Sequence, residues 1–235
     1  MANKVCAIIG VGPGNGEAYA RRFAADGYAV ALMARSADKL DRLAAELDGA
    51  RAYACDAADP DQVTAALAQA AQALGAVDVL LYNAGSGIFG AIDEIELEAM
   101  EMAWRVNTLG LAVAARAVAP AMLDKGSGTI FITGATASLR GGAGFAGFAQ
   151  AKAAQRSLAQ SMARLWGPKG LHVAYMIIDG VVDGTPSRQL EAFKDKPADA
   201  FLKPEDIADT VHFICHQPRS AWTFEYDVRP FCERW

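Results

Sequence analysis

A lysine near the middle of the chain follows an aromatic residue by one helical turn. The stretch AGFAQAKAAQ spans residues 146–155 and places Phe148 and Lys152 four residues apart. In a helix this spacing lays the two side chains over one another on one face, an arrangement used for chemistry. Phenylalanine, however, has no proton to donate. The stretch is therefore open to three interpretations: an active site, a cofactor site without its acid, or helix packing.

Glycines between an apolar segment and a helical segment give a second chemical signal. The stretch IIGVGPGNGEAYARRFA carries Gly10, Gly14 and Gly16. Absent side chains allow a tight turn and let backbone N–H groups at the helix start approach a pyrophosphate. We include Asn15, between the last two glycines, among the expected contacts. Taken alone, such a loop is equally well explained as a turn.

A basic residue follows the next apolar segment. In ALMARSADKL, Arg35 comes after Ala34 and lies where the ribose of an adenosine would lie. A carboxylate there would accept hydrogen bonds from both ribose hydroxyls and repel a 2′-phosphate, whereas an arginine does the reverse. The sequence therefore predicts NADP(H) rather than NAD(H), unless Arg35 is only a solvated residue near a helix start.

Seven short apolar segments alternate with Ala/Leu-rich helical stretches and must position these residues. They are 4–10, 28–34, 50–55, 77–83, 128–134, 171–178 and 222–228. Buried strands that alternate with helices predict an α/β fold. We expect a single Rossmann-like, doubly wound domain over residues 1–235, with a seven-stranded parallel sheet and helices on both faces. The polar, proline-punctuated stretch at about 185–204 is expected to be a flexible flap.

Local signals mark some helix ends. Ser36 and Asp59 offer capping oxygens, and Pro60 follows the second of these at a first helical position. Gly167 and Pro168 should end the helix that contains Lys152.

Composition excludes several classes of partner. The 235 residues are 53% hydrophobic and 21% charged, and the net charge of −5 has no Lys/Arg-rich block, so neither nucleic acid nor an anionic membrane is expected. The N-terminus lacks a signal-peptide pattern, and the apolar stretch LAVAARAVAPAML is broken by Arg116 and Pro120. A cytoplasmic protein is predicted. Its four cysteines, which lack C-x-x-C spacing, are expected to be reduced: Cys6, Cys55, Cys215 and Cys232.

Taken together and in their order along the chain, these motifs make the sequence resemble the short-chain dehydrogenase/reductase family over essentially its whole length. The residues that carry the resemblance are Gly10, Gly14 and Gly16, then Asp56, the NAG motif at Asn83, Ala84 and Gly85, then Asn107 and Lys152. The resemblance implies an oxidoreductase with a small-molecule substrate, assembled as a homodimer or homotetramer. Asp56 would accept a hydrogen bond from the adenine amino group, or it is only a turn residue. The NAG motif would pass the adenosine ribose.

The family pattern also implies roles near the nicotinamide. Asn107 resembles the asparagine that holds a water for a proton relay, although exposure to solvent would also explain an asparagine inside a regular helix. Lys152 resembles the lysine that binds the nicotinamide-ribose hydroxyls and lowers the pKa of a tyrosine one turn earlier. Gly180 and Val182 would offer backbone groups to the carboxamide.

The chain departs from the family where the proton donor should be. The tyrosine position holds Phe148 and the serine position holds Ala135, while Thr136 and Ser138 are possible substitutes. Shifting the frame finds no tyrosine on this helix. Asp179 replaces a proline of the family pattern and Asp183 follows it, and the sequence assigns neither a role.

Three functions follow from these residues. The first is an NADP(H)-dependent oxidoreductase that takes its proton from water, the substrate, Thr136, Ser138 or an aspartate of DGVVDG, and for which activated alkenes or iminium-like substrates would suit. The alternative is a non-catalytic NADP(H)-binding sensor or partner subunit. The third is a metal site at His212 and His216, beside Cys215; because no acidic residue lies between the histidines, we expect no metal there.

Overall fold

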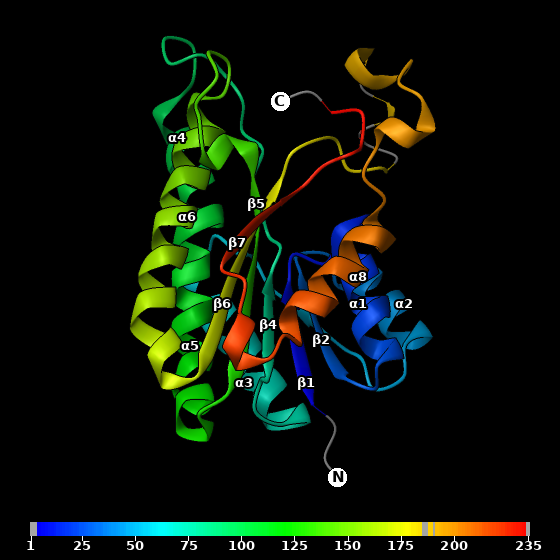
Figure 1. Ribbon diagram of the computed structural model, residues 1–235, viewed down its shortest axis with the longest axis vertical. Helices are drawn as coiled ribbons and strands as arrows, with labels where there is room; N and C mark the ends of the chain where they lie inside the picture. The colour runs from blue at the N-terminus through cyan, green and yellow to red at the C-terminus, as the bar shows by residue number, and fades with distance from the viewer. Residues whose placement is uncertain (1–3, 185–187, 190, 234–235) are drawn as a thin grey trace.

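Seven parallel strands form one sheet in the computed structural model, which describes residues 4–184, 188–189 and 191–233 (Figure 1). The strands are β1 Val5–Ile9, β2 Ala29–Ala34, β3 Arg51–Ala54, β4 Val79–Tyr82, β5 Gly128–Ala135, β6 Leu171–Ile178 and β7 Glu225–Val228. Their order across the sheet is β3-β2-β1-β4-β5-β6-β7. The predicted seven-stranded α/β fold is therefore confirmed.

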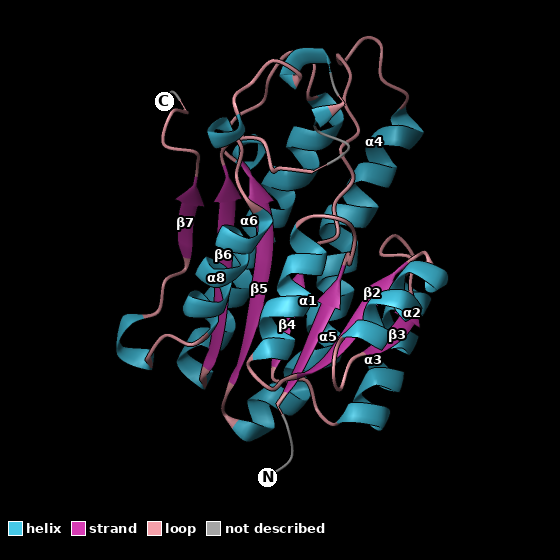
Figure 2. Ribbon diagram, turned by 90° about the vertical axis from the view of Figure 1, so that its right-hand side faces the viewer, coloured by secondary structure: helices cyan, strands magenta, loops and turns pink. Residues whose placement is uncertain are grey.

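Helices cover both faces of this sheet. They are α1 Asn15–Ala25, α2 Ala37–Glu46, α3 Pro60–Leu74, α4 Leu97–Trp104, α5 Gly110–Lys125, α6 Ala146–Trp166 and α8 Pro204–Cys215. One apolar core lies between the sheet and helices α3, α5 and α6, and a second lies between the sheet and α1, α2 and α8. Figures 1 and 2 show these two helical layers on opposite sides of the strands. Short helical turns join them: 105–109, 136–138, 167–169, 191–193, 198–200 and 219–221.

Burial differs between the centre and the edges of the sheet. Every residue of β1 and β4 is buried, as expected for parallel strands covered by helices on both faces. The edge strands β3 and β7 contain no fully buried residue. The expectation of seven buried strands was therefore wrong at both edges, where a strand has only one neighbour.

The direction in which successive strands are added to the sheet reverses between β1 and β4. From β1 the chain moves outward through β2 and β3, then returns to place β4 on the other side of β1, with Ile9 beside both Met33 and Tyr82. In open α/β sheets ligands bind outside the carboxyl ends of the strands at such a switch point. The loops after β1 and β4 meet there, which places Gly10 beside Ala84.

The predicted helix ends were mostly, but not all, correct. The Asp59 side chain accepts hydrogen bonds from the N–H groups of Asp61 and Gln62 and so caps α3, and α6 ends at Trp166. Ser36 precedes α2, but its side chain makes no capping hydrogen bond, so that prediction was wrong. The four thiols are free, as expected.

Helix α5 continues through Pro120 instead of ending there. Among the described residues, one helical run, Leu97–Lys125, is apolar and long enough by composition to cross a membrane. Half of its most apolar window is buried inside the fold, as in a helix that packs in a protein core.

The expected flap at 185–204 lies only partly within the described residues. Residues 185–187 and 190 fall outside them, and the remainder forms two short helical turns before α8. At its end, Leu202 forms a parallel bridge with Val182. The flexibility of this segment stays a prediction.

Candidate functional site

The glycine turn after β1 approaches the backbone of two other segments. Gly10 has a φ of 98°, and a Cβ on it would lie 2.3 Å from the Ala84 nitrogen. A Cβ on Gly16 would lie 2.4 Å from the Gly10 carbonyl oxygen. Asn83 donates a side-chain hydrogen bond of 2.8 Å to that same carbonyl. These positions require glycine because backbone occupies the space that a side chain would fill.

The first turn of α1 lies at the same edge of the sheet. Gly14 precedes the helix with a φ of 98°, and Asn15 is its first residue. Asn15 Oδ1 is buried and has no hydrogen-bond partner. N–H groups at a helix start bind anions well, so this turn suits a pyrophosphate.

One cavity of about 380 Å³ joins the residues predicted to hold the adenosine. Its lining includes Gly10, Arg35, Asp56, Asn83, Ala84 and Gly85. Arg35 is exposed at its mouth. Asp56 Oδ1 accepts a hydrogen bond of 2.9 Å from the Ala58 N–H, so its turn role is present beside its place in the cavity.

A second cavity, of about 330 Å³, shares Val11 and Gly12 with the first. Ser36, Lys39 and Arg42 line it. Sequence reasoning passed over these three residues because Ser36 was assigned to capping α2. The signal available in the sequence was a serine followed by two basic residues three positions apart on one helix.

Asn107 lies in a π-helical turn, Arg105–Leu109, between α4 and α5. The side chain has no exposed area, so solvent exposure does not explain it, and the helix is not regular there. Asn107 Nδ2 donates to the carbonyls of Ala103, at 2.8 Å, and Ser86, at 3.2 Å. Asn107 Oδ1 is buried without a partner, which leaves an acceptor aimed at the site. Single π-helical turns often occur at functional sites.

Lys152 is also buried, with 4% of its surface exposed. Its Nζ donates to the Thr133 carbonyl, at 2.9 Å, and to Gln155 Oε1, at 3.0 Å. Burial lowers the pKa of Lys152 to about 7. A Cβ built on Gly85 would lie 3.5 Å from Asn107 Oδ1 and 3.8 Å from Lys152 Nζ, so the asparagine and the lysine flank the NAG turn.

Three phenylalanines form an aromatic cluster beside this lysine. The Phe148 ring lies 5.4 Å from that of Phe89, which lies 5.1 Å from that of Phe145. Phe89 and Phe145 are exposed, whereas Phe148 is half-buried. Phe89, in the loop after β4, was missed because nothing in its local sequence links it to α6.

Of the residues considered as substitute proton donors, Thr136 and Asp179 already have polar contacts. Thr136 Oγ1 lies 2.7 Å from Asp179 Oδ1 and 3.1 Å from the Ile178 carbonyl. Asp179 also pairs with Arg229 at 3.2 Å. Ser138 is buried, and its hydroxyl makes no hydrogen bond of normal geometry. Burial raises the pKa of the Tyr175 phenol to about 12, against an opposing effect of the nearby Ser138 hydroxyl. Ala135 ends β5 and offers no hydroxyl.

The turn after β6 has its own charge pairing. Arg188 binds Asp183 through two hydrogen bonds of 2.6 and 2.8 Å and lowers the pKa of its carboxyl. Gly180, with a φ of 151°, packs against Pro230. The groups on either side of Val182 bond to Leu202.

Comparison with known proteins identifies the family. The profile of the family described as short chain dehydrogenase matches residues 4–195. The chain belongs to this family. It is 31% identical over 225 residues to the meso-2,3-butanediol dehydrogenase of Serratia marcescens, covering 93% of this chain and 89% of that one.

Solved structures of the short-chain dehydrogenase family agree with the fold. A short-chain dehydrogenase from Rhodopseudomonas palustris is 37% identical, with a TM-score of 0.85 over 98% of this chain and 100% of that one. A metagenomic short-chain oxidoreductase, solved in complex with NADP, is 28% identical, with a TM-score of 0.83 over 97% and 98%. The protein is thus a member of an oxidoreductase family whose chemistry uses a nicotinamide cofactor.

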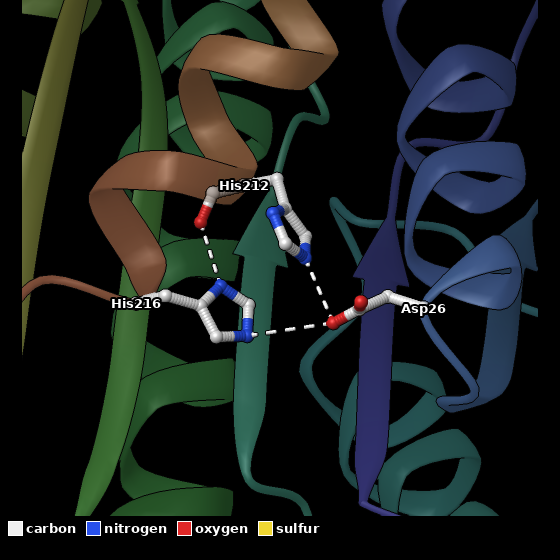
Figure 3. A group of neighbouring side chains, drawn as sticks. All are labelled: Asp26, His212 and His216. Atoms are coloured by element: carbon white, nitrogen blue, oxygen red, sulfur yellow. Dashed lines mark hydrogen bonds and ion pairs between the residues drawn. The ribbon is translucent and has the colours of Figure 1, made fainter.

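The histidine pair of this family member lies away from the cavity that the glycine turn lines. His212 and His216 converge on Asp26, which follows α1 and which sequence reasoning missed (Figure 3). His212 Nε2 lies 3.0 Å from Asp26 Oδ2, and Arg22 Nη2 lies 3.0 Å from His212 Nδ1. Because a guanidinium only donates, His212 Nδ1 accepts and Nε2 carries the proton toward Asp26. This tautomer favours a hydrogen-bonded clamp between α1 and α8 over a metal ligand.

Proposed function

We propose that this protein is an NADP(H)-dependent oxidoreductase that acts on a small molecule without the usual phenolic proton donor. The observation that carries the proposal is the joint lining of one cavity by Gly10, Arg35, Asp56 and Asn83, with Lys152 and Asn107 behind Gly85. In this arrangement the glycines would contact the pyrophosphate, the Asp56 carboxylate would contact the adenine, and Lys152 would contact the nicotinamide ribose. Each of these three parts of a dinucleotide would then have a binding group.

Charge at the end of β2 supports NADP(H) over NAD(H). Arg35 is exposed at the cavity mouth, and Lys39, Arg42 and the uncommitted Ser36 hydroxyl line the adjoining hollow. A 2′-phosphate would gain charge-assisted hydrogen bonds from these groups. The metagenomic relative solved with NADP supports the same assignment.

Two of the three N–H groups of the Lys152 ammonium bond to the Thr133 carbonyl and to Gln155 Oε1. The third would bind the nicotinamide-ribose hydroxyls. Asn107 Oδ1, buried and unpartnered, would hold a water beside it. Gly180 and Val182 lie in the turn after β6 and would contact the carboxamide.

The substrate class follows from what surrounds the reactive ring. A reduced nicotinamide supplies a hydride, and the Phe148 position supplies no proton to a developing alkoxide. Thr136 already bonds Asp179, and Asp179 and Asp183 are each paired with an arginine. The Ser138 hydroxyl is buried beside the Tyr175 phenol. We therefore favour activated alkenes or iminium-like compounds, which need no proton on oxygen, bound against the aromatic cluster of Phe89, Phe145 and Phe148.

The test has two steps. NADPH and NADH binding are measured by fluorescence, and NADPH consumption is then followed across carbonyls, enones and imines. Steady turnover of one compound class, with NADPH preferred, supports the proposal. If the protein binds neither NADPH nor NADH, the proposal is overturned.

A second candidate is a non-catalytic NADP(H) sensor or partner subunit. It is favoured by the loss of both hydroxyls, at Phe148 and Ala135, while Lys152 is kept. Binding of NADPH without turnover over the whole panel would establish it instead. In either case we propose a homodimer or homotetramer assembled through α5 and α6, to be checked by sedimentation.

A further inference from the structure

A fully buried glutamine links the two polar residues behind the NAG turn. Gln155 lies on α6, three residues after Lys152, and has no exposed area. Gln155 Oε1 accepts a hydrogen bond of 3.0 Å from Lys152 Nζ. Its Nε2 donates one of 2.7 Å to the Asn107 backbone carbonyl, in the π-helical turn. One side chain thus joins α6 to the turn that carries Asn107.

The orientation of this amide is fixed by its partners. An ammonium has only donors and a carbonyl only accepts, so exchanging the oxygen and nitrogen of Gln155 would break both bonds. The Tyr175 hydroxyl, on β6, lies 3.4 Å from Gln155 Oε1 and 3.4 Å from the Lys152 carbonyl. Because a hydroxyl both donates and accepts, this contact packs against the amide without selecting its orientation. A Cβ on Gly134 would lie 2.3 Å from the Tyr175 ring, which shows how tightly that ring is packed.

We propose that Gln155 is a positioning residue, whose amide holds Lys152 Nζ and the Asn107 turn at a fixed separation beside the nicotinamide-ribose site. The inference rests on the proposed function for its consequence in cofactor binding. The network itself exists without the cofactor, so it is open to a direct measurement.

The neutral charge of Gln155 matters because burial is the cause that lowers the pKa of Lys152. Within the described part of the chain, the groups around its ammonium are neutral: the Thr133 carbonyl from β5, the Gln155 amide and the Phe148 ring from α6, and the Asn107 amide across Gly85, with the un-ionised Tyr175 phenol behind Gln155. A carboxylate in place of the amide would favour the charged lysine, whereas removing the acceptor would disfavour it. Gln155 therefore keeps Lys152 in place while letting it titrate near neutral pH.

Two substitutions of similar length separate the two bonds. Gln155→Glu keeps an acceptor for Lys152 but loses the donor to Asn107. Gln155→Met loses both and adds no charge. Gln160→Glu, eight residues after Lys152 on the same helix and partly exposed, repeats the charge change as a control.

The experiment is an NMR titration of lysine side chains in the cofactor-free protein, with Lys152→Met used to assign the Lys152 signal. We expect the Lys152 midpoint to rise by about one pH unit or more in Gln155→Glu, to fall in Gln155→Met, and to stay at the native value in Gln160→Glu. If Gln155→Glu does not fold, the fall in Gln155→Met decides. A midpoint equal to the native one in both Gln155 variants would overturn the proposal.

The consequence for the cofactor is measured separately. NADPH affinity of the native protein should weaken as pH rises through the Lys152 titration, and this loss should move to higher pH in Gln155→Glu. A change of affinity by the same factor at every pH would indicate a merely structural role and would count against positioning. If the native protein binds NADPH at no pH, the proposed function fails, while the cofactor-free titration still decides the role of Gln155.

Discussion

Phe148 lies one helical turn before Lys152 on α6, with its ring centroid 5.9 Å from the lysine Nζ. At that distance the ring face and an ammonium attract one another weakly. The helix therefore places an aromatic ring beside the lysine, at the position where we propose that the family carries its tyrosine, but this ring has no hydroxyl. Under the proposed function, an aromatic ring occupies this position without supplying a proton donor.

Restoring that hydroxyl should restore carbonyl chemistry. A positioned general acid contributes about 10² to 10⁴ in rate, or about 3 to 5 kcal/mol of barrier. We expect Phe148→Tyr to raise ketone reduction with NADPH by at least about tenfold, because the new phenol would lie beside Lys152. Initial rates on a ketone panel measure the gain.

The control for this substitution is Lys152→Ala in the same background. The gain should vanish with the lysine, since the phenol then loses its cationic neighbour. If Phe148→Tyr changes nothing and Lys152→Ala leaves NADPH binding intact, these residues do not form the site.

Strong local patterns are what made the fold predictable. Seven apolar segments and the glycine turn each carry their own signal, and Asp59 before Pro60 is a cap readable from two residues. Contacts between distant segments left no such signal. Phe89 reaches Phe148 only because the loop after β4 folds over α6, and Asp26 meets His212 only because α1 packs on α8.

Local conformation inside an element was also hidden. The sequence around Asn107 reads as a regular helix, yet the chain forms a π-helical turn there. Gln155 resembles any polar residue of a long helix until the fold brings the Asn107 carbonyl within 2.7 Å of it.

Reversing the charge at Arg35 should exchange the cofactor preference. Arg35→Asp would repel a 2′-phosphate and accept hydrogen bonds from the hydroxyls of an unphosphorylated ribose. We expect NADPH affinity to fall by about tenfold or more and the ratio of NADH to NADPH affinity to rise. Calorimetry with both nucleotides measures this. Arg116 is an exposed arginine on α5, and the control variant Arg116→Ala should leave the affinities for both nucleotides unchanged. An unchanged ratio of NADH to NADPH affinity in Arg35→Asp would show that Arg35 does not belong to the site.

Two glycines of the first turn, Gly10 and Gly12, offer a matched pair for stability. Gly10→Ala puts a Cβ 2.3 Å from the Ala84 nitrogen at a φ of 98°, whereas Gly12→Ala meets nothing within 4 Å. We expect Gly10→Ala to lower the free energy of unfolding by at least about 1 to 3 kcal/mol, and Gly12→Ala to leave it nearly unchanged. Urea denaturation followed by circular dichroism compares them. Equal effects would mean that the β1 and β4 loops do not meet as described.

Acid should destabilise the fold through two histidines, the buried His172 and the partly buried His212. Burial is the main cause that lowers the pKa of both His172 and His212, against the opposing effects of the Thr223 carbonyl and of Asp26. A base with a lowered pKa binds fewer protons when folded, so its contribution is complete above the unfolded pKa of about 6.5 and is lost as pH falls from there through the folded pKa. The Asp26 carboxyl, whose pKa is lowered mainly by its hydrogen bond to His212, acts only at more acidic pH.

We therefore expect the urea midpoint to fall between about pH 7 and pH 5. His212→Gln keeps a donor for Asp26 but cannot gain charge, so its midpoint should fall less steeply over this interval. A native midpoint that stays level, or one that rises on acidification, would show that these rings are as easily protonated in the folded chain as in the unfolded one.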